Sequence, residues 1–356
     1  MTKKKKIIWI ELLRIVACLG VIMLHMGSQH FRDIPVDSYS WKVSNLYHGI
    51  TRFAVACFVM ISGSLYLDKG RTWTPKKVIR NGFLPIAAAF TFWQCFYAVY
   101  RTVKVGKIPV LSLNFIKRIF ILMSESYFHL WYLPMLLSLI LIAPFLWKIV
   151  NGENGKQWEK FLLILFVLFQ IIPNTLNDFP LPYKEYVVNL MNLVKPDLVT
   201  GYAGYFVLGH YLSHYDISPK LEKLVYVLAV VCGGCGIFLC QYYSIQNGKP
   251  TQAFYENFTF AAFFMSTGMM LLFKNYIGKI KWSEKAEEVI CFVGGHTFGI
   301  YLIHALFRDL LQRVGADTLF MNTFIAIPLL SVLIFVLSGV SSVVIKKIPV
   351  IGKWIM

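Results

Sequence analysis

The sequence has few charged residues and a large excess of apolar ones. Only 15% of its 356 residues are Asp, Glu, Lys or Arg, whereas 57% are hydrophobic, and the mean hydropathy is +0.60. This composition excludes a soluble globular protein and favours one that crosses a membrane several times. No stretch resembles a separate soluble domain or an internal repeat. We therefore expect residues 1–356 to form a single all-α, polytopic membrane domain.

Several catalytic and cofactor-binding motifs are also missing. The chain has no G-x-x-x-x-G-K-[ST] loop, no G-x-G-x-x-G turn and no G-x-S-x-G elbow. Its eight histidines are dispersed, with no H-E-x-x-H or H-x-x-E-H pattern, so we expect no resident metal. The seven cysteines lie almost entirely within apolar runs, which gives no disulfide framework. We expect no permanently bound cofactor.

Ten apolar runs are present, and most are long enough to cross a bilayer, which takes about 20 residues. They cover residues 7–27, 46–67, 81–100, 129–147, 161–173, 199–213, 224–244, 257–273, 289–307 and 321–345. We interpret the first as a retained span rather than a cleaved signal peptide. The segment 115–123 is apolar but too short to span, which indicates a re-entrant or interfacial element.

The basic residues indicate how the chain is oriented. Net charge is +17, but the cations lie in short connections between apolar runs, so lipid and topology explain them and we expect no nucleic-acid partner. If the N-terminus is cytoplasmic, inner segments hold 21 of the 35 Lys and Arg residues and outer segments 12. This bias predicts a multi-pass protein of the cell membrane with both termini in the cytoplasm.

The first apolar run carries three ionisable residues, Glu11, Arg14 and His25. Arg14 and His25 are eleven residues apart, about three helical turns, so they share a face at a separation of roughly 16 Å. Glu11 lies one turn before Arg14 and is placed to pair with it. Ionisable residues within a span are costly and usually functional. The alternative is a structural ion pair with His25 at a helix end.

Further candidates occur in the second span and the loop after it. Arg52 needs an anionic or carbonyl partner within the membrane. Ser62 precedes Gly63, a pair that also suits close helix packing. Lys77 and Arg80 lie one helical turn apart at the start of the third span, where they would grip a polyanion or, as the alternative, anchor the loop at the inner face.

Later spans contribute aromatic and histidine residues. His129-Leu-Trp131-Tyr132 opens the fourth span, and Tyr301-Leu-Ile-His304 lies in the ninth. Aromatic residues at a membrane interface are common, and a lone histidine is more often packed than catalytic. Together with Arg14 and His25, however, these residues predict a polar interior.

In combination, these residues resemble the integral-membrane acyltransferase-3 family, over essentially the whole chain. The match consists of Arg14-x10-His25, Arg52 with Phe58…Ser62-Gly63, Lys77-x-x-Arg80, His129-Leu-Trp131-Tyr132, Tyr205-Phe206…Gly209 and Ile300-Tyr301-Leu302-Ile303-His304. Two positions depart from the family pattern. Glu11 stands where many relatives have Asp, and Lys77 where many have Arg. The soluble domains that some relatives carry have no counterpart in this sequence.

The resemblance implies an O-acyltransferase, most simply an acetyltransferase, that takes its acyl group from cytoplasmic acetyl-CoA and delivers it to a hydroxyl of a cell-surface glycan or similar acceptor. Arg14, Arg52, Lys77 and Arg80 would hold the acyl-CoA. His25, with Glu11, would carry the chemistry, either as general base or as an acylated nucleophile. Ser62, His129, Trp131, Tyr301 and His304 would complete the site.

Two other classes of function remain open at this stage. In a transporter or flippase, Arg14, His25 and Arg52 would line a translocation path. Such proteins often show internal repeats and interrupted helices, which this chain lacks. In an idle scaffold, the basic cytoplasmic face would bind partners.

Overall fold

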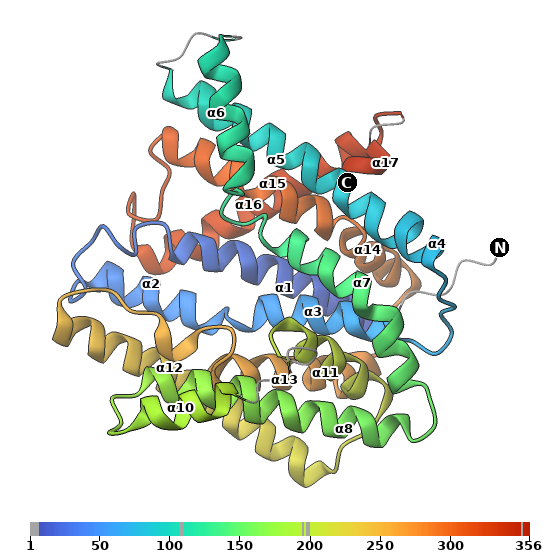
Figure 1. The fold of residues 1–356 in the computed structure, drawn as a ribbon. Coiled ribbons are helices and arrows are strands. Elements are labelled where there is room, and N and C mark those ends of the chain that lie inside the picture. The colour runs from blue at the N-terminus through green and yellow to red at the C-terminus, as the bar shows by residue number, and fades with distance from the viewer. Residues whose placement is uncertain (1–6, 107–109, 111, 194–195, 197–199, 350–351) are drawn as a thin grey trace.

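The computed structural model describes residues 7–106, 110, 112–193, 196, 200–349 and 352–356, which form a bundle of helices (Figure 1). No β-strand occurs within these ranges, and the all-α prediction is confirmed. Some cations that entered the charge count, namely Lys3–Lys6, Lys107 and Lys195, lie outside the described residues.

The helices follow one another with short connections. The first half contains α1 (Ile8–Gly27), α2 (Tyr39–Ile50), α3 (Phe53–Tyr66), α4 (Pro75–Lys77), the π-helix η1 (Val78–Phe83), α5 (Leu84–Val105), α6 (Leu113–Ser124), α7 (Tyr132–Val150), α8 (Gly155–Phe166) and the π-helix η2 (Val167–Ile171). The second half contains α9 (Ile172–Asp178), α10 (Lys184–Leu193), α11 (Tyr202–His214), α12 (Pro219–Asn247), the 3-10 helix η3 (Ala253–Tyr255), α13 (Phe260–Asn275), the 3-10 helix η4 (Ile277–Lys279), α14 (Glu284–Gly294), α15 (Thr297–Arg313), α16 (Thr323–Lys346) and α17 (Gly352–Ile355).

Within the described ranges, eight helical segments are long and apolar enough to cross a membrane, or nine if α14 and α15, bent by 55°, form one span. These segments match the predicted runs in order, apart from the sixth. That run, 199–213, begins outside the described residues and contains α11, which has 13 residues. At 1.5 Å per residue α11 is about 20 Å long, so this helix alone covers only part of a hydrocarbon core of about 30 Å.

One other prediction about the spans needs correction. The run 46–67 belongs to a longer segment that starts at Tyr39 and is interrupted at Thr51 and Arg52, between α2 and α3. The short segment 115–123, which we expect to be re-entrant or interfacial, forms α6, which lies beside α5 at the edge of the bundle (Figure 1) and is not one of the long apolar segments. The Gln94 side chain of α5 donates to the Met123 carbonyl of α6 over 2.8 Å.

Most helices run between two ends of the bundle, which we name the α4 end and the α2 end (Figure 1). Helix α1 begins at the α4 end and finishes beside α2. Gly294 packs against Glu11 near the start of α1, and Gly299 packs against Ser342 near the end of α16. The N-terminal end of α1 and the C-terminal end of α16 therefore lie at the same end of the bundle.

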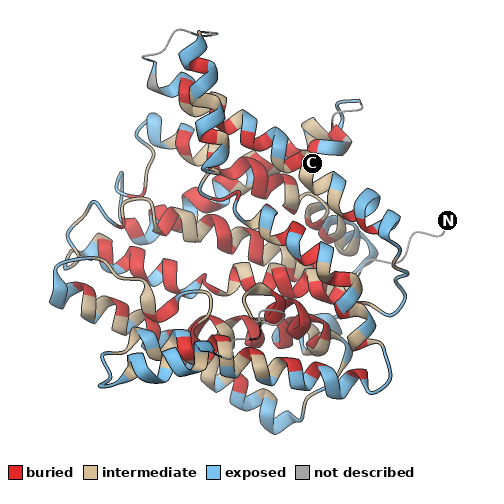
Figure 2. Cartoon of the chain, viewed as in Figure 1, coloured by how far each residue is buried: buried red, intermediate tan, exposed pale blue. Residues whose placement is uncertain are grey.

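The distribution of buried residues is that of a membrane protein. Buried side chains fill the middle of the bundle, while its outer surface remains exposed (Figure 2). That outer surface is apolar: Val230 and Phe238 of α12 are 76% and 63% exposed, and Val340 of α16 is 60% exposed. Such large apolar surfaces are unfavourable in water but natural against lipid.

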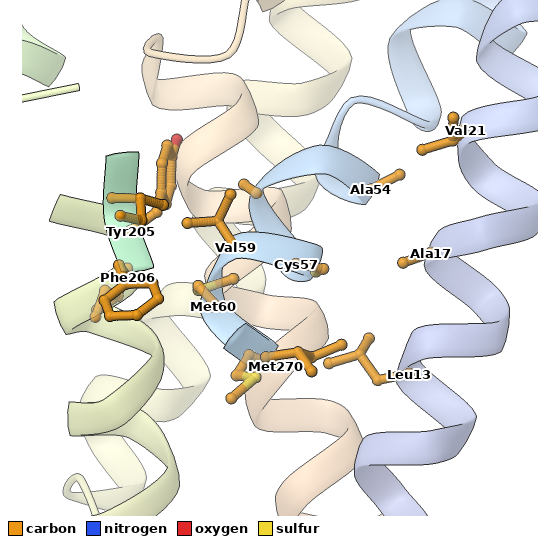
Figure 3. Close-up of a cluster of buried hydrophobic side chains, with 14 of the residues drawn as sticks. Leu13, Ala17, Val21, Ala54, Cys57, Val59, Met60, Tyr205, Phe206 and Met270 are labelled. Atoms are coloured by element: carbon orange, nitrogen blue, oxygen red, sulfur yellow. The ribbon is translucent and has the colours of Figure 1, made fainter. Parts of the chain in front are cut away.

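Helix α3 lies at the centre of the apolar core. Leu13, Ala17 and Val21 of α1 face Ala54 and Cys57 of α3 (Figure 3). On the opposite side α3 meets α11 through two glycines that approach each other's backbones. A Cβ atom on Gly63 would collide with the Phe206 carbonyl, and one on Gly209 with the Met60 carbonyl. Small residues allow this close contact, which is how helices often associate in membranes.

Candidate functional site

A cavity of about 420 Å³ lies within the bundle, between α1, α3, α7 and α15. Most of the predicted site residues line it, from four separate parts of the chain: Arg14, His25, Arg52, Ser62, His129, Trp131 and Tyr301. The remaining wall is contributed by Val21, Leu24, Val55, Phe58, Tyr132, Leu136, Asn257, Thr297 and Phe298. This volume falls in the range of small-molecule sites, which are mostly apolar with a few placed polar groups.

The spacing argument for α1 is confirmed by this geometry. Arg14 and His25 both face the cavity, with Arg14 toward the α4 end and His25 toward the α2 end. Arg14 Nη1 donates to Glu11 Oε1 and Oε2 at 3.0 and 3.1 Å. Glu11 does not line the cavity but is 5% exposed, buried against Gly294 of α14. Its carboxylate therefore fixes the guanidinium and is remote from His25.

Three histidine rings gather at the α2 end of the cavity. The rings of His25 and His304 stack with centroids 5.3 Å apart, and those of His129 and His304 meet edge to face at 4.9 Å. Phe128 contacts the His25 ring edge to face at 4.9 Å. The predicted histidines of α1, of the segment just before α7 and of α15 are thus brought together. Within the described residues, no group of three potential ligands is arranged to hold a metal ion.

Hydrogen bonds fix which nitrogen carries the proton in two of these rings. His304 Nδ1 lies 2.6 Å from the Tyr301 carbonyl, and His129 Nε2 lies 3.4 Å from the Leu302 carbonyl. A carbonyl only accepts, so each of these nitrogens must be an N–H donor. His304 Nε2 and His129 Nδ1 then carry lone pairs, and both atoms are buried with no partner in the part of the chain that the structure describes. The Tyr301 hydroxyl donates to the His129 carbonyl and holds α15 against the start of α7.

Arg52 belongs to the α2 end of the cavity. Its Nη2 donates to Gln252 Oε1 at 2.9 Å and lies 3.3 Å from His48 Nε2, while its Nη1 lies 3.5 Å from Glu256 Oε2. The side chain is 6% exposed, yet its Nε is buried without a partner. Because α2 ends at Ile50 and α3 begins at Phe53, the interruption places this guanidinium between the cavity and the 252–256 segment.

Lys77 and Arg80 lie apart from the cavity, exposed at the α4 end. Lys77 closes the single turn of α4, which Thr74 caps by accepting from the Lys77 N–H at 3.3 Å. The Lys77 ammonium donates to the Thr72 hydroxyl at 2.5 Å. Arg80 lies in the π-helix η1, whose wider turn changes the angle between the two side chains. The structure therefore does not bring all four predicted donor-binding cations together.

Some cavity residues were not identified from the sequence. Tyr132 was seen only as part of an aromatic interface motif, although it lines the cavity beside Ser62 and Leu136. Asn257 follows the polar 248–256 connection and resembled an ordinary loop residue. In both cases the available signal was a polar side chain in the first few residues of an apolar run.

Comparison with known proteins gives one match. The family model for acyltransferase 3, described as an acyltransferase domain, matches residues 7–345, which is nearly the whole chain. No curated protein and no solved structure gives a significant match.

Proposed function

Because the chain belongs to the acyltransferase-3 family and is a membrane acyltransferase, we propose that it is an O-acyltransferase with acetyl-CoA as donor. The acceptor is a hydroxyl of a cell-surface glycan or a related molecule on the outer side. The α4 end of the bundle then faces the cytoplasm, and both termini lie there, which agrees with the excess of Lys and Arg in the predicted inner segments.

One observation carries the proposal: a single cavity is lined by the fixed Arg14 guanidinium toward one end and by the His25 and His129 imidazoles toward the other, with His304 packed against both rings. Arg14 and His25 are separated by about 16 Å along α1. The pantetheine arm of a donor whose phosphates remain at the α4 end would run through this space. Its thioester would reach His25, where an acceptor hydroxyl arrives from the opposite side.

The reaction needs a base and a proton donor in sequence. His25 takes the proton from the acceptor hydroxyl as its oxygen attacks the thioester carbonyl. The new C–O bond forms, the C–S bond breaks, and the imidazolium returns the proton to the CoA thiolate. Histidine suits both steps because its unperturbed pKa of about 6.5 lies near neutral pH. The other route is an acyl-histidine formed on the same ring and then resolved by the hydroxyl.

The contacts of the other residues support separate roles at the two ends. Arg14, oriented by Glu11, would bind the amides or anionic groups of the donor. Arg52, bound to Gln252 and Glu256 at the α2 end, would contact the acceptor instead. Ser62, Trp131 and Tyr301 line the space between.

The test is an incubation of the purified protein with acetyl-CoA labelled in the acetyl group. We expect the thioester to be consumed in the presence of a cell-surface glycan fraction and the label to appear in the glycan. If labelled acetyl-CoA crossed the membrane of proteoliposomes intact, the chain would be a transporter. A protein that neither consumed nor moved it would contradict both functions.

A further inference from the structure

A second cavity, a groove of about 360 Å³, lies at the α4 end of the bundle, between the 73–79 segment and α7. Its lining comes from the segment before and within η1 and from the C-terminal half of α7, and includes Trp73, Val78, Phe145, Trp147 and Lys148. We name it the tryptophan groove. It combines aromatic side chains with a nearby concentration of positive charge.

The indole of Trp73 has an unused hydrogen-bond donor. Its Nε1 is buried without a partner among the described residues, whereas the Nε1 of Trp147 donates to the Asp68 carbonyl at 3.0 Å. The Trp73 ring is held by Tyr66, which stacks at 5.9 Å, and by the Arg71 guanidinium, 5.2 Å from the ring centroid. A donor buried without a partner is uncommon in proteins, and the residue that carries this one lines the groove, so a small shift of the indole would offer its N–H to a ligand with an acceptor atom.

The cations around the groove suit a phosphorylated ligand. Lys148 lines it, and Lys76, Lys77 and Arg80 are exposed on α4 and η1, the segments that form its other wall. Charge-assisted hydrogen bonds to phosphate are among the stronger ones that side chains make. An aromatic groove with a free donor, bordered by ammonium and guanidinium groups, therefore has the features that recognise a nucleotide.

The groove and the catalytic cavity share a wall. Val78 lines the groove and packs with Leu136 and Ile140 in one cluster, and Leu136 lines the cavity. Tyr132, another cavity residue, packs against the same cluster, as does Trp73. A ligand seated in the groove thus lies one layer of side chains from the α4 end of the cavity.

We propose that the tryptophan groove binds the adenine base of the acyl-CoA donor. Trp73 Nε1 donates to a ring nitrogen of the base, the aromatic side chains pack against its faces, and Lys77 and Arg80 contact the phosphates. This rests on the proposed use of acyl-CoA. The proposal also gives Lys77 and Arg80, which lie apart from the catalytic cavity, a function in donor binding.

The test compares two donors that differ only in the nucleotide: acetyl-CoA and acetyl-pantetheine. Trp73→Phe keeps an aromatic ring and removes the N–H. We expect it to raise the KM for acetyl-CoA about ten-fold, while the kcat and the KM for acetyl-pantetheine stay at their wild-type values. Trp282→Phe is the matched control, because Trp282 Nε1 is also buried without a partner but lies outside the groove. It should change neither KM.

Binding of adenosine 3′,5′-bisphosphate, measured by calorimetry, separates failure of the inference from failure of the function. If wild type consumes neither thioester but binds this nucleotide through Trp73, the groove stands and the proposed reaction fails. Equal effects of Trp73→Phe on both donors, or on neither, would overturn the inference. So would a Trp73→Phe protein with altered binding of anionic phospholipid and unaltered nucleotide binding, since the groove would then seat a lipid.

Discussion

The imidazole of His304 lies nearly parallel to that of His25, with ring centroids 5.3 Å apart and 16° between the ring planes. His304 is itself immobilised, because its Nδ1 donates to the Tyr301 carbonyl and its ring also meets His129. The His25 ring is held between His304 and Phe128, and among the described residues it has no hydrogen-bond partner. Its nitrogens are therefore available to substrate, while its orientation is set by packing.

His304 is a positioning residue, and its contribution follows from this stack. An aromatic pair stabilises by about 0.5–1.5 kcal/mol beyond area burial, so His304→Ala should lower kcat by roughly ten-fold or less and leave the KM for acetyl-CoA unchanged. His304→Phe keeps a ring in place and should restore most of the rate. Steady-state kinetics of the two variants check this. Equal loss in both would mean that the His304 nitrogens take part in the reaction.

Replacement of His25 tests the chemistry directly. His25→Ala should reduce turnover by about 10²–10⁴-fold, the usual contribution of general acid–base catalysis. Acetyl-CoA binding and the thermal unfolding temperature in detergent should stay close to wild type, because the ring borders a cavity rather than the apolar core. A folded His25→Ala protein with a near wild-type rate would end this mechanism.

Substitutions at the two ends of the site should raise the KM of different substrates. Loss of a charged hydrogen-bond partner costs about 1.5–3 kcal/mol, or roughly ten- to a hundred-fold in affinity. Arg80→Ala should raise the KM for acetyl-CoA by such a factor and leave the acceptor KM unchanged. Arg52→Ala should do the reverse, since Arg52 contacts Gln252 and Glu256 at the opposite end. The prediction is wrong if both variants alter the same KM.

Glycine packing between α3 and α11 should contribute measurably to the stability of the bundle. Gly63→Ala places a Cβ against the Phe206 carbonyl, and such overpacking costs about 1–3 kcal/mol. We expect a lower unfolding temperature in detergent. Gly234→Ala on α12 is the matched control, because nothing lies within 4 Å of its added Cβ. The control should match or slightly exceed wild type in stability.

Membrane orientation can be checked by labelling single cysteines in intact cells, in a background without the native cysteines. Asn177 and Gln246 are exposed in the last turns of α9 and α12, at helix ends that we place outside, and Asn154 and Ser283 are exposed in connections that we place in the cytoplasm. We expect a membrane-impermeant reagent to label the first two positions only. Labelling at Asn154 from outside would reverse or break this topology.

The part of the site on α1 was predictable from the sequence because an α-helix fixes the angle between residues eleven apart. The parts that depend on departures from regular helices were not. Arg52 sits where α2 and α3 are interrupted, which a continuous apolar run conceals. Lys77 and Arg80 are not aligned as a regular α-helix would align them, because the π-helix η1 changes the angle between them. The His304 stack depends on α15 following α14 at a 55° bend, which only tertiary packing determines.

The mutual contact of Gly63 and Gly209 has a consequence for how substrates enter. Each glycine is seated on the other helix's backbone, which leaves little room for α3 and α11 to slide past each other, so we expect the two helices to move together. Packed elements of this kind change arrangement by hinges elsewhere rather than by deformation. We therefore expect any widening of the cavity to come from its opposite wall, where α15 meets α14 at a bend and α7 carries a proline at position 144.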